Sequence, residues 1–168
     1  MKTRIKICVV ASVAILAVVL LVFALFVFNT KALSAPLFVN GKLVGHESAE
    51  ITYNMFKETT ALPLLAVLEA LGAQVTDVSD GIQQIVLDNT TYKLNVTAKT
   101  FTSTNDPDGF DYLAIPPGTN GYICQVKDGD VHINHSSMKY VLNKLGYDSV
   151  DITVDRYGKK VIVSAVRT

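Results

Sequence analysis

The sequence predicts an α+β fold in which two repeats of a helix plus an antiparallel β-hairpin form sheets covered by helices. The first observation is a repeat: residues 67–72 (VLEALG) return 74 positions later as residues 141–146 (VLNKLG). The second is that each copy looks like the end of an amphipathic helix closed by glycine, followed by an alternating β-branched stretch. The third is an apolar run near the start, which predicts one N-terminal transmembrane or signal helix before the repeats.

The first 28 residues differ in composition from the rest of the chain. Residues 1–6 form a basic start, and residues 7–28 are an apolar run of 22 residues. At about 1.5 Å per helical residue the run spans about 33 Å, enough to cross a hydrocarbon core of about 30 Å. The pattern therefore predicts a single-pass anchor in the cell membrane, a linker over residues 29–36 and everything after it outside. Secretion after cleavage of a signal peptide stays open as the alternative.

Residues 37–168 are long enough to form one extracytoplasmic domain with its own core. From Ala35 onward the chain has fifteen acidic and eleven basic residues, a formal charge of −4. This acidic balance, without a basic stripe, argues against nucleic acid as a partner. Cys124 is the only cysteine beyond the apolar run, so no disulfide can form within this domain.

The first repeat covers about residues 37–96 and begins with a predicted hairpin. Asn40 and Gly41 separate two apolar runs, and Asn-Gly is the strongest short-range hairpin signal because both residues tolerate positive φ. Residues 51–56 alternate as a strand would. Thr59 or Thr60 is expected to cap the helix that follows, with Pro63 in its first turn.

Further strands are expected over residues 75–78 and 82–87 and from Tyr92 onward, with an extension to Phe101 in one continuous run left open. Residues 105–121 contain several prolines and glycines and are expected to form a long loop.

The second repeat covers about residues 120–166. It is expected to contain a strand over residues 122–126, a helix capped by Asn134 or Ser136, and strands over residues 150–154 and 160–166. The positions that define the two repeats are Pro63, Leu68, Leu71, Gly72, Leu142, Leu145 and Gly146.

Residues 62–75 (LPLLAVLEALGAQV) resemble the signature of the copper amine oxidase N-terminal-like domain, also called the stalk domain. Residues 39–42 (VNGK) are similar to the hairpin that precedes it, and residues 145–147 (LGY) to the end of its second copy. The chain departs from the family pattern at Leu65 and Lys139, where the family has arginine. The resemblance implies a non-catalytic accessory module of exported bacterial proteins, with no copper and no other cofactor expected.

The sequence carries no recognisable catalytic or metal-binding constellation. His132 and His135 fall at a strand end, where positions three apart face opposite ways. Residues 106–111 (DPDGFD) cluster the carboxylates that Ca²⁺ prefers, but an EF-hand spacing fails. The candidate contacts for a partner are polar and aromatic residues in and after the long loop: Asp106, Asp108, Phe110, Asp111, Tyr112 and Tyr122.

These observations predict a non-catalytic, membrane-anchored or secreted envelope module that contacts cell-wall polymer or a surface protein. The alternative is a regulator or inhibitor of an exported enzyme, acting through the loop of residues 105–121. A third reading is an enzyme whose site the sequence does not reveal.

Overall fold

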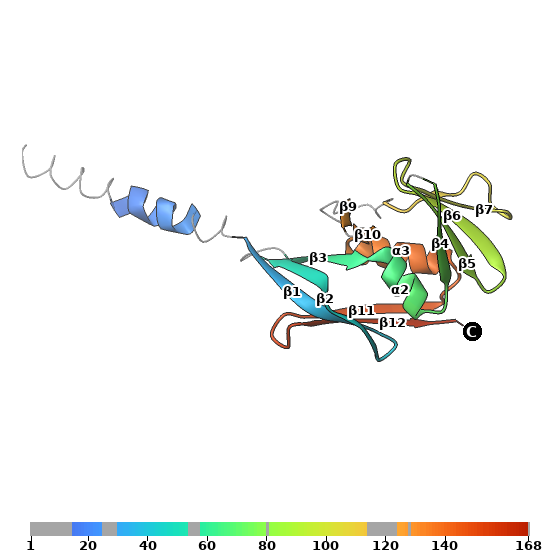
Figure 1. Cartoon of the computed structure of the whole chain (residues 1–168). Helices are drawn as coiled ribbons and strands as arrows, with labels where there is room; N and C mark the ends of the chain where they lie inside the picture. The colour runs from blue at the N-terminus through green and yellow to red at the C-terminus, as the bar shows by residue number, and fades with distance from the viewer. Residues whose placement is uncertain are drawn as a thin grey trace, which may run out of the picture. The chain divides into compact units, whose positions relative to one another are not determined.

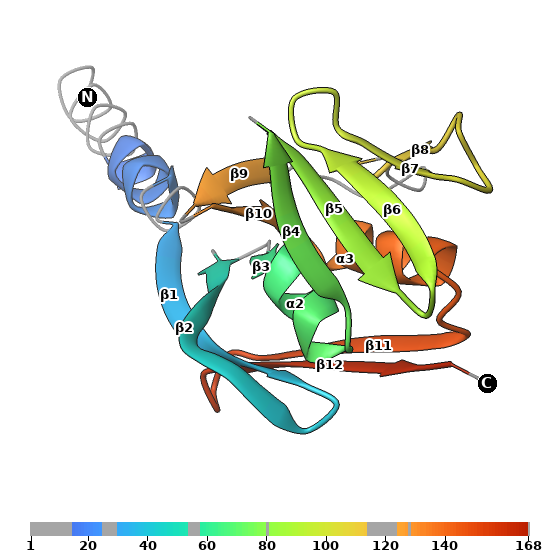
Figure 2. The ribbon, with the colours of Figure 1, turned by 45° about the vertical axis from the view of Figure 1, so that its right-hand side comes forward.

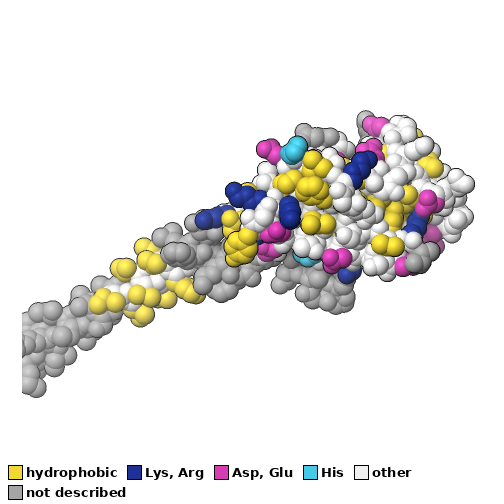
Figure 3. Space-filling view, turned by 90° about the horizontal axis from the view of Figure 1, so that it is seen from below, with side chains coloured by type: hydrophobic (Ala, Val, Ile, Leu, Met, Phe, Trp, Pro, Cys, Tyr) yellow, Lys and Arg dark blue, Asp and Glu magenta, His cyan; other side chains and the backbone are white. Residues whose placement is uncertain are grey.

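The computed structural model describes residues 15–24, 30–53, 58–79, 81–113, 124–127 and 129–167. They divide into two units, residues 1–32 with 52–58 and residues 33–51 with 59–168. The first unit contains a helix over residues 15–24, and Figure 3 shows apolar side chains gathered along it. Those side chains are exposed, for example Ile15 at 65% and Leu21 at 62%.

Within the described residues, no helix is long and apolar enough to cross a membrane. This finding contradicts the predicted anchor over residues 7–28 and the predicted location in the cell membrane. Residues 7–14 and 25–28 of that prediction lie outside the described part of the chain.

The fold class is mostly β, and the prediction of an α+β fold is wrong. Strands make up 55% of the described residues and helices 21%, and the strands form two sheets. The helices are short. Thr59 and Thr60, expected to cap a helix, belong to a strand, and residues 110–111 of the expected loop form another. The labelled elements are β1 (Lys31–Val39), β2 (Lys42–Tyr53), β3 (Glu58–Pro63), α2 (Leu64–Ala70), β4 (Gln74–Ser79), β5 (Ile82–Leu87), β6 (Thr90–Asn95), β7 (Thr100–Ser103), β8 (Phe110–Asp111), β9 (Cys124–Lys127), β10 (Asp130–Ile133), α3 (His135–Lys144), β11 (Ser149–Asp155) and β12 (Lys160–Val166).

The larger sheet has seven strands in the order β11-β12-β1-β2-β3-β10-β9 (Figure 1). The predicted hairpin at Asn40 is confirmed, with φ of 47° at Asn40 and 78° at Gly41. The neighbouring strand β12 runs parallel to β1, pairing Leu37 with Val161. Asn40 extends this pairing, because its side chain donates to the Ala165 carbonyl and accepts from the Ala165 N–H, both at 2.9 Å.

The smaller sheet has five strands in the order β4-β5-β6-β7-β8. Figures 1 and 2 place α2 and α3 between this sheet and the β11–β12 hairpin. Phe101 of β7 is fully buried; its ring stacks on Phe110 at 5.4 Å, and Phe110 meets Tyr140 of α3 edge-on at 5.8 Å. Aromatic contacts therefore join α3 to the smaller sheet. Other buried positions on the helices include Leu64, Val67, Leu68, Met138, Val141 and Leu142.

The helices α2 and α3 are each followed by an antiparallel hairpin, but the two hairpins belong to different sheets. β4–β5 follows α2 in the smaller sheet, and β11–β12 follows α3 in the larger one. Gly72 and Gly146 end the helices with φ of 100° and 89°, as predicted for left-handed C-terminal residues. Similar local sequence therefore gives similar local structure, while the distant strand partners differ.

The helix α2 begins later than predicted. Thr59 and Thr60 belong to β3, and Pro63 is the N-cap of α2, not a residue of its first turn. The residue before a proline avoids the α region, so the chain stays extended through Leu62. Thr60 is buried, and its hydroxyl instead accepts from the backbone N–H of His135 at 3.2 Å. In α3, Asn134 is the N-cap, and its side chain accepts from the Ser137 N–H at 2.8 Å.

Arg167 ties the end of β12 to two other parts of the second unit. Its guanidinium donates to the carbonyls of Leu145 and Gly146, where α3 ends, and pairs with Asp88 in the β5–β6 turn. It also lies over the Tyr147 ring, 4.8 Å from the centroid. These contacts link the C-terminal end of α3, β12 and the smaller sheet.

Tyr147 makes stability at alkaline pH a testable property of this region. Burial raises the pKa of its phenol above the usual 10.0, and nearby Tyr92 raises it further. Below pH 10 both folded and unfolded chains keep the proton, whereas above it the unfolded chain loses the proton first, so stability falls as pH rises. We expect Tyr147→Phe to reduce the loss of unfolding free energy between about pH 8 and about pH 11.

Tyr157→Phe is the control for this experiment, because Tyr157 is 87% exposed. Denaturant unfolding at both pH values should show the same alkaline loss in this variant as in the wild type. An unchanged loss in Tyr147→Phe would contradict the assignment of the effect to Tyr147.

Candidate functional site

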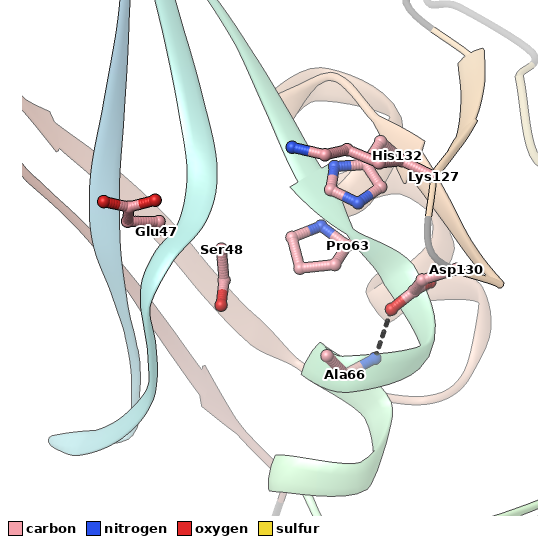
Figure 4. A pocket seen from close by; sticks show the side chains of 7 residues that line it. All are labelled: Glu47, Ser48, Pro63, Ala66, Lys127, Asp130 and His132. Atoms are coloured by element: carbon pink, nitrogen blue, oxygen red, sulfur yellow. Dashed lines mark hydrogen bonds between the residues drawn. The ribbon is translucent and has the colours of Figure 1, made fainter.

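A pocket of about 370 Å³ lies within the second unit, between β2 on one side and β3, β10 and the start of α2 on the other (Figure 4). It is lined by Glu47, Ser48, Pro63, Ala66, Lys127, Asp130 and His132. Its volume falls in the range of about 300–1,000 Å³ that is typical of sites for small ligands.

The strand pairing of β3 with β10 places His132 at this pocket. His132 stands opposite Pro63 and Ile133 opposite Leu62 in an antiparallel ladder. Side chains alternate along a strand, and Val131 and Ile133 are fully buried, so His132 faces away from that core. His135 is elsewhere: it begins α3, and its ring Nδ1 lies 3.2 Å from the Thr60 hydroxyl.

Asp130 caps α2 from a strand that is distant in sequence. Its Oδ1 accepts from the Leu65 N–H at 2.8 Å and from the Val131 N–H at 2.6 Å, and its Oδ2 accepts from the Ala66 N–H at 2.9 Å. The first N–H groups of a helix lack partners within the helix, and a carboxylate there also suits the helix dipole. Both oxygens of Asp130 are therefore engaged in holding the helix at the pocket wall.

Lys127 and Glu47 bring opposite charges to the rim. Lys127 stands opposite Asp130 in the strand register of the β9–β10 hairpin, whose turn residue Gly129 has a φ of 81°. Both Lys127 and Glu47 are exposed. In Figure 4 the Lys127 side chain extends past His132 toward the side of β2, where Ser48 projects from that strand, and the Pro63 ring lies on β3.

The chemistry of this arrangement suits binding. An ammonium, a carboxylate, an imidazole and a hydroxyl offer both donors and acceptors around an open space. Asp130 is a poor candidate for a general base because its lone pairs already accept three backbone N–H groups. Among the residues that the structure describes, no group of three or more His, Cys, Asp or Glu is placed to hold a metal ion.

The predicted partner contacts lie on the smaller sheet, and most of them hold its loop. The Asp106 carboxylate accepts from the Gly109 N–H at 3.1 Å, and that of Asp111 from the Leu113 N–H at 2.7 Å. Tyr112 is fully buried, with its hydroxyl donating to the Val96 carbonyl at 3.4 Å. Phe110 is half-buried in the aromatic stack, and Asp108 is exposed. Tyr122 lies outside the described residues.

Of the pocket residues, only Pro63 and His132 stand out in the sequence, and neither is expected there to belong to this site. Asp130 begins a strand, but nothing local indicates that its partners Leu65 and Ala66 lie 65 and 64 positions earlier. A cap predicted at Thr59 or Thr60 concealed the absence of a local cap for α2. An aspartate next to a strand, together with an uncapped helix, is the only signal that could have suggested the contact.

In addition to this pocket, the second unit has a groove of about 290 Å³ on the smaller sheet. It is lined by Thr91, Lys93, Thr102, Ser103, Thr104 and Pro107.

Comparisons of this chain with protein-family models, with curated proteins and with solved structures found no match. The resemblance to the copper amine oxidase N-terminal-like domain therefore stays a prediction from residues 62–75.

Proposed function

We propose that this protein is a non-catalytic binding module that contacts a cell-wall polymer or a surface protein through the pocket between β2 and β10. The observation that carries this proposal is the state of Asp130. The half-buried Asp130 carboxylate accepts from three backbone N–H groups, while the ammonium of Lys127 and the carboxylate of Glu47 at the rim are exposed. A site with fixed walls and exposed polar rim groups suits recognition of a polar ligand.

The resemblance to a family of accessory modules agrees with a non-catalytic role. The loop of residues 105–121 is a weaker candidate for the contact, because its described residues 105–113 are held by turns and by packing on the smaller sheet. We therefore favour the pocket over inhibition of an enzyme by this loop.

Sedimentation with purified cell-wall sacculi tests the proposal on the full chain. The wild type should pellet with the sacculi, and Lys127→Ala should weaken binding by about tenfold, the effect of losing about 1.4 kcal/mol of a charged contact. Lys139→Ala, which removes an exposed lysine from α3, should bind as the wild type does.

The two arms of the proposal are separated by a cross-linking pull-down from intact cells. A cross-linked surface protein whose capture is lost in Lys127→Ala would identify the protein arm if sacculi do not bind. Equal binding by Lys127→Ala and wild type would contradict the pocket assignment. The absence of both sedimentation and capture would contradict the proposed function itself.

A further inference from the structure

The groove on the smaller sheet lies on the face turned away from the core. Tyr92 and Leu94 of β6 face inward, and Leu94 is fully buried. Thr91 and Lys93, which alternate with them along the strand, therefore face outward. The register places Lys93 directly opposite Thr102 of β7. Side chains from two neighbouring strands therefore form the floor of the groove.

One wall of the groove is held in place by a turn over residues 103–106. The Ser103 N–H donates to the Asp106 carbonyl at 2.9 Å, and the Asp106 N–H donates to the Ser103 hydroxyl at 3.0 Å. The Asp106 carboxylate then accepts from the Gly109 N–H, which fixes the position of Pro107 between them. A site with a wall already ordered loses less conformational entropy on binding.

The lining of the groove defines the chemical class of its ligand. It has four hydroxyl groups, one ammonium and one proline ring, with no carboxylate among the lining residues. A hydroxyl both donates and accepts, as sugar hydroxyls do, and the Ser103 hydroxyl still has its proton to donate. The methyl groups of threonine and the ring of Pro107 offer apolar contact to the C–H face of a sugar.

We propose that this groove binds a saccharide unit of a glycan, with Thr91, Lys93 and Thr102 as the contacts on its floor. The volume of about 290 Å³ suits a ligand at the small end of the usual range, so one sugar residue of a longer chain occupies it. This assignment does not rest on the pocket at β2 and β10, since it concerns a different surface of the second unit.

Titration of the full chain with two oligosaccharides, followed by NMR shifts of backbone amides, tests the assignment. The probes are chitotetraose, which is neutral, and tetragalacturonic acid, which carries carboxylates. We expect saturable shifts in residues 91–104 with at least one of them, and Thr102→Val should raise the dissociation constant about fivefold or more because a hydroxyl contact is lost at constant shape. Preferential binding of the acidic probe, lost in Lys93→Gln, would assign Lys93 to the carboxylate.

Thr76→Val is the matched control, because Thr76 is an exposed threonine of β4 in the same sheet and does not line the groove. It should bind as the wild type does, and Thr91→Val is the second groove variant if Thr102→Val fails to fold. The absence of shifts in residues 91–104 with both probes would overturn the proposal, as would equal affinity of folded groove variants and wild type. These results are independent of sacculus binding by Lys127→Ala, so the two proposals can fail separately.

Discussion

Replacing Gly109 with alanine is expected to lower the free energy of unfolding by about 2–5 kcal/mol, as the sum of backbone strain and overpacking. Gly109 has a φ of 64°, a conformation that residues with a Cβ rarely adopt. A Cβ there would also overlap the backbone carbonyl of Phe101 and press on the Thr102 side chain. The Phe101 backbone cannot move cheaply, because its ring is fully buried and stacked on Phe110.

Gly129→Ala provides the matched control for this experiment. Gly129 also has a positive φ, of 81°, but a Cβ there would meet nothing within 4 Å. It should therefore cost only the backbone term, about 1–2 kcal/mol. Denaturant unfolding of both variants measures the contact term as their difference, and equal losses would contradict the close approach of Gly109 to Phe101.

The hairpin turn at Asn40 was predictable because one or two adjacent residues decide a turn. Asn40 and Gly41 form the predicted hairpin turn, and Asp88 and Asn89 adopt positive φ in the turn between β5 and β6. Asparagine, aspartate and glycine tolerate that conformation wherever they stand in a fold. The end of α2 at Gly72 follows from the same local chemistry.

The fold class was mispredicted because strand partners come from distant sequence. β12 pairs with β1 although Asn40 and Ala165 are 125 positions apart. The continuous strand considered from Tyr92 to Phe101 is interrupted by a turn over residues 96–99, where the Asn95 side chain accepts from the Ala98 N–H at 2.8 Å. Repeated helix ends carry no information on which sheet the following hairpin joins.

The candidate site was less predictable than the turns, since it is assembled by pairing that the sequence does not encode locally. His132 reaches the pocket through its register with Pro63, and Asp130 through the start of α2. Both residues would look like ordinary strand-end polar residues in isolation. The pocket therefore depends on the same long-range contacts that decide the sheet order.

Asp130→Ala is expected to destabilise the domain by about 2–3 kcal/mol, because three backbone N–H groups lose their acceptor. The open pocket lets water replace part of the lost interaction, which keeps the effect below that of three fully buried bonds. The N–H groups of Leu65 and Ala66 should also lose protection from hydrogen exchange, since their partner is the removed carboxylate. Denaturant unfolding and exchange measured by NMR check the two effects.

Asp130→Asn separates the role of the carboxylate from that of side-chain size. An amide has one acceptor oxygen, and its NH₂ would face an N–H group, so we expect this variant to lose about as much stability as Asp130→Ala or slightly less. Asp108→Ala, at an exposed aspartate, should change the unfolding free energy by less than about 0.5 kcal/mol. If Asp130→Ala were equally mild, a tertiary cap on α2 would be contradicted. A structural role for Asp130, on which the non-catalytic proposal depends, would then be contradicted as well.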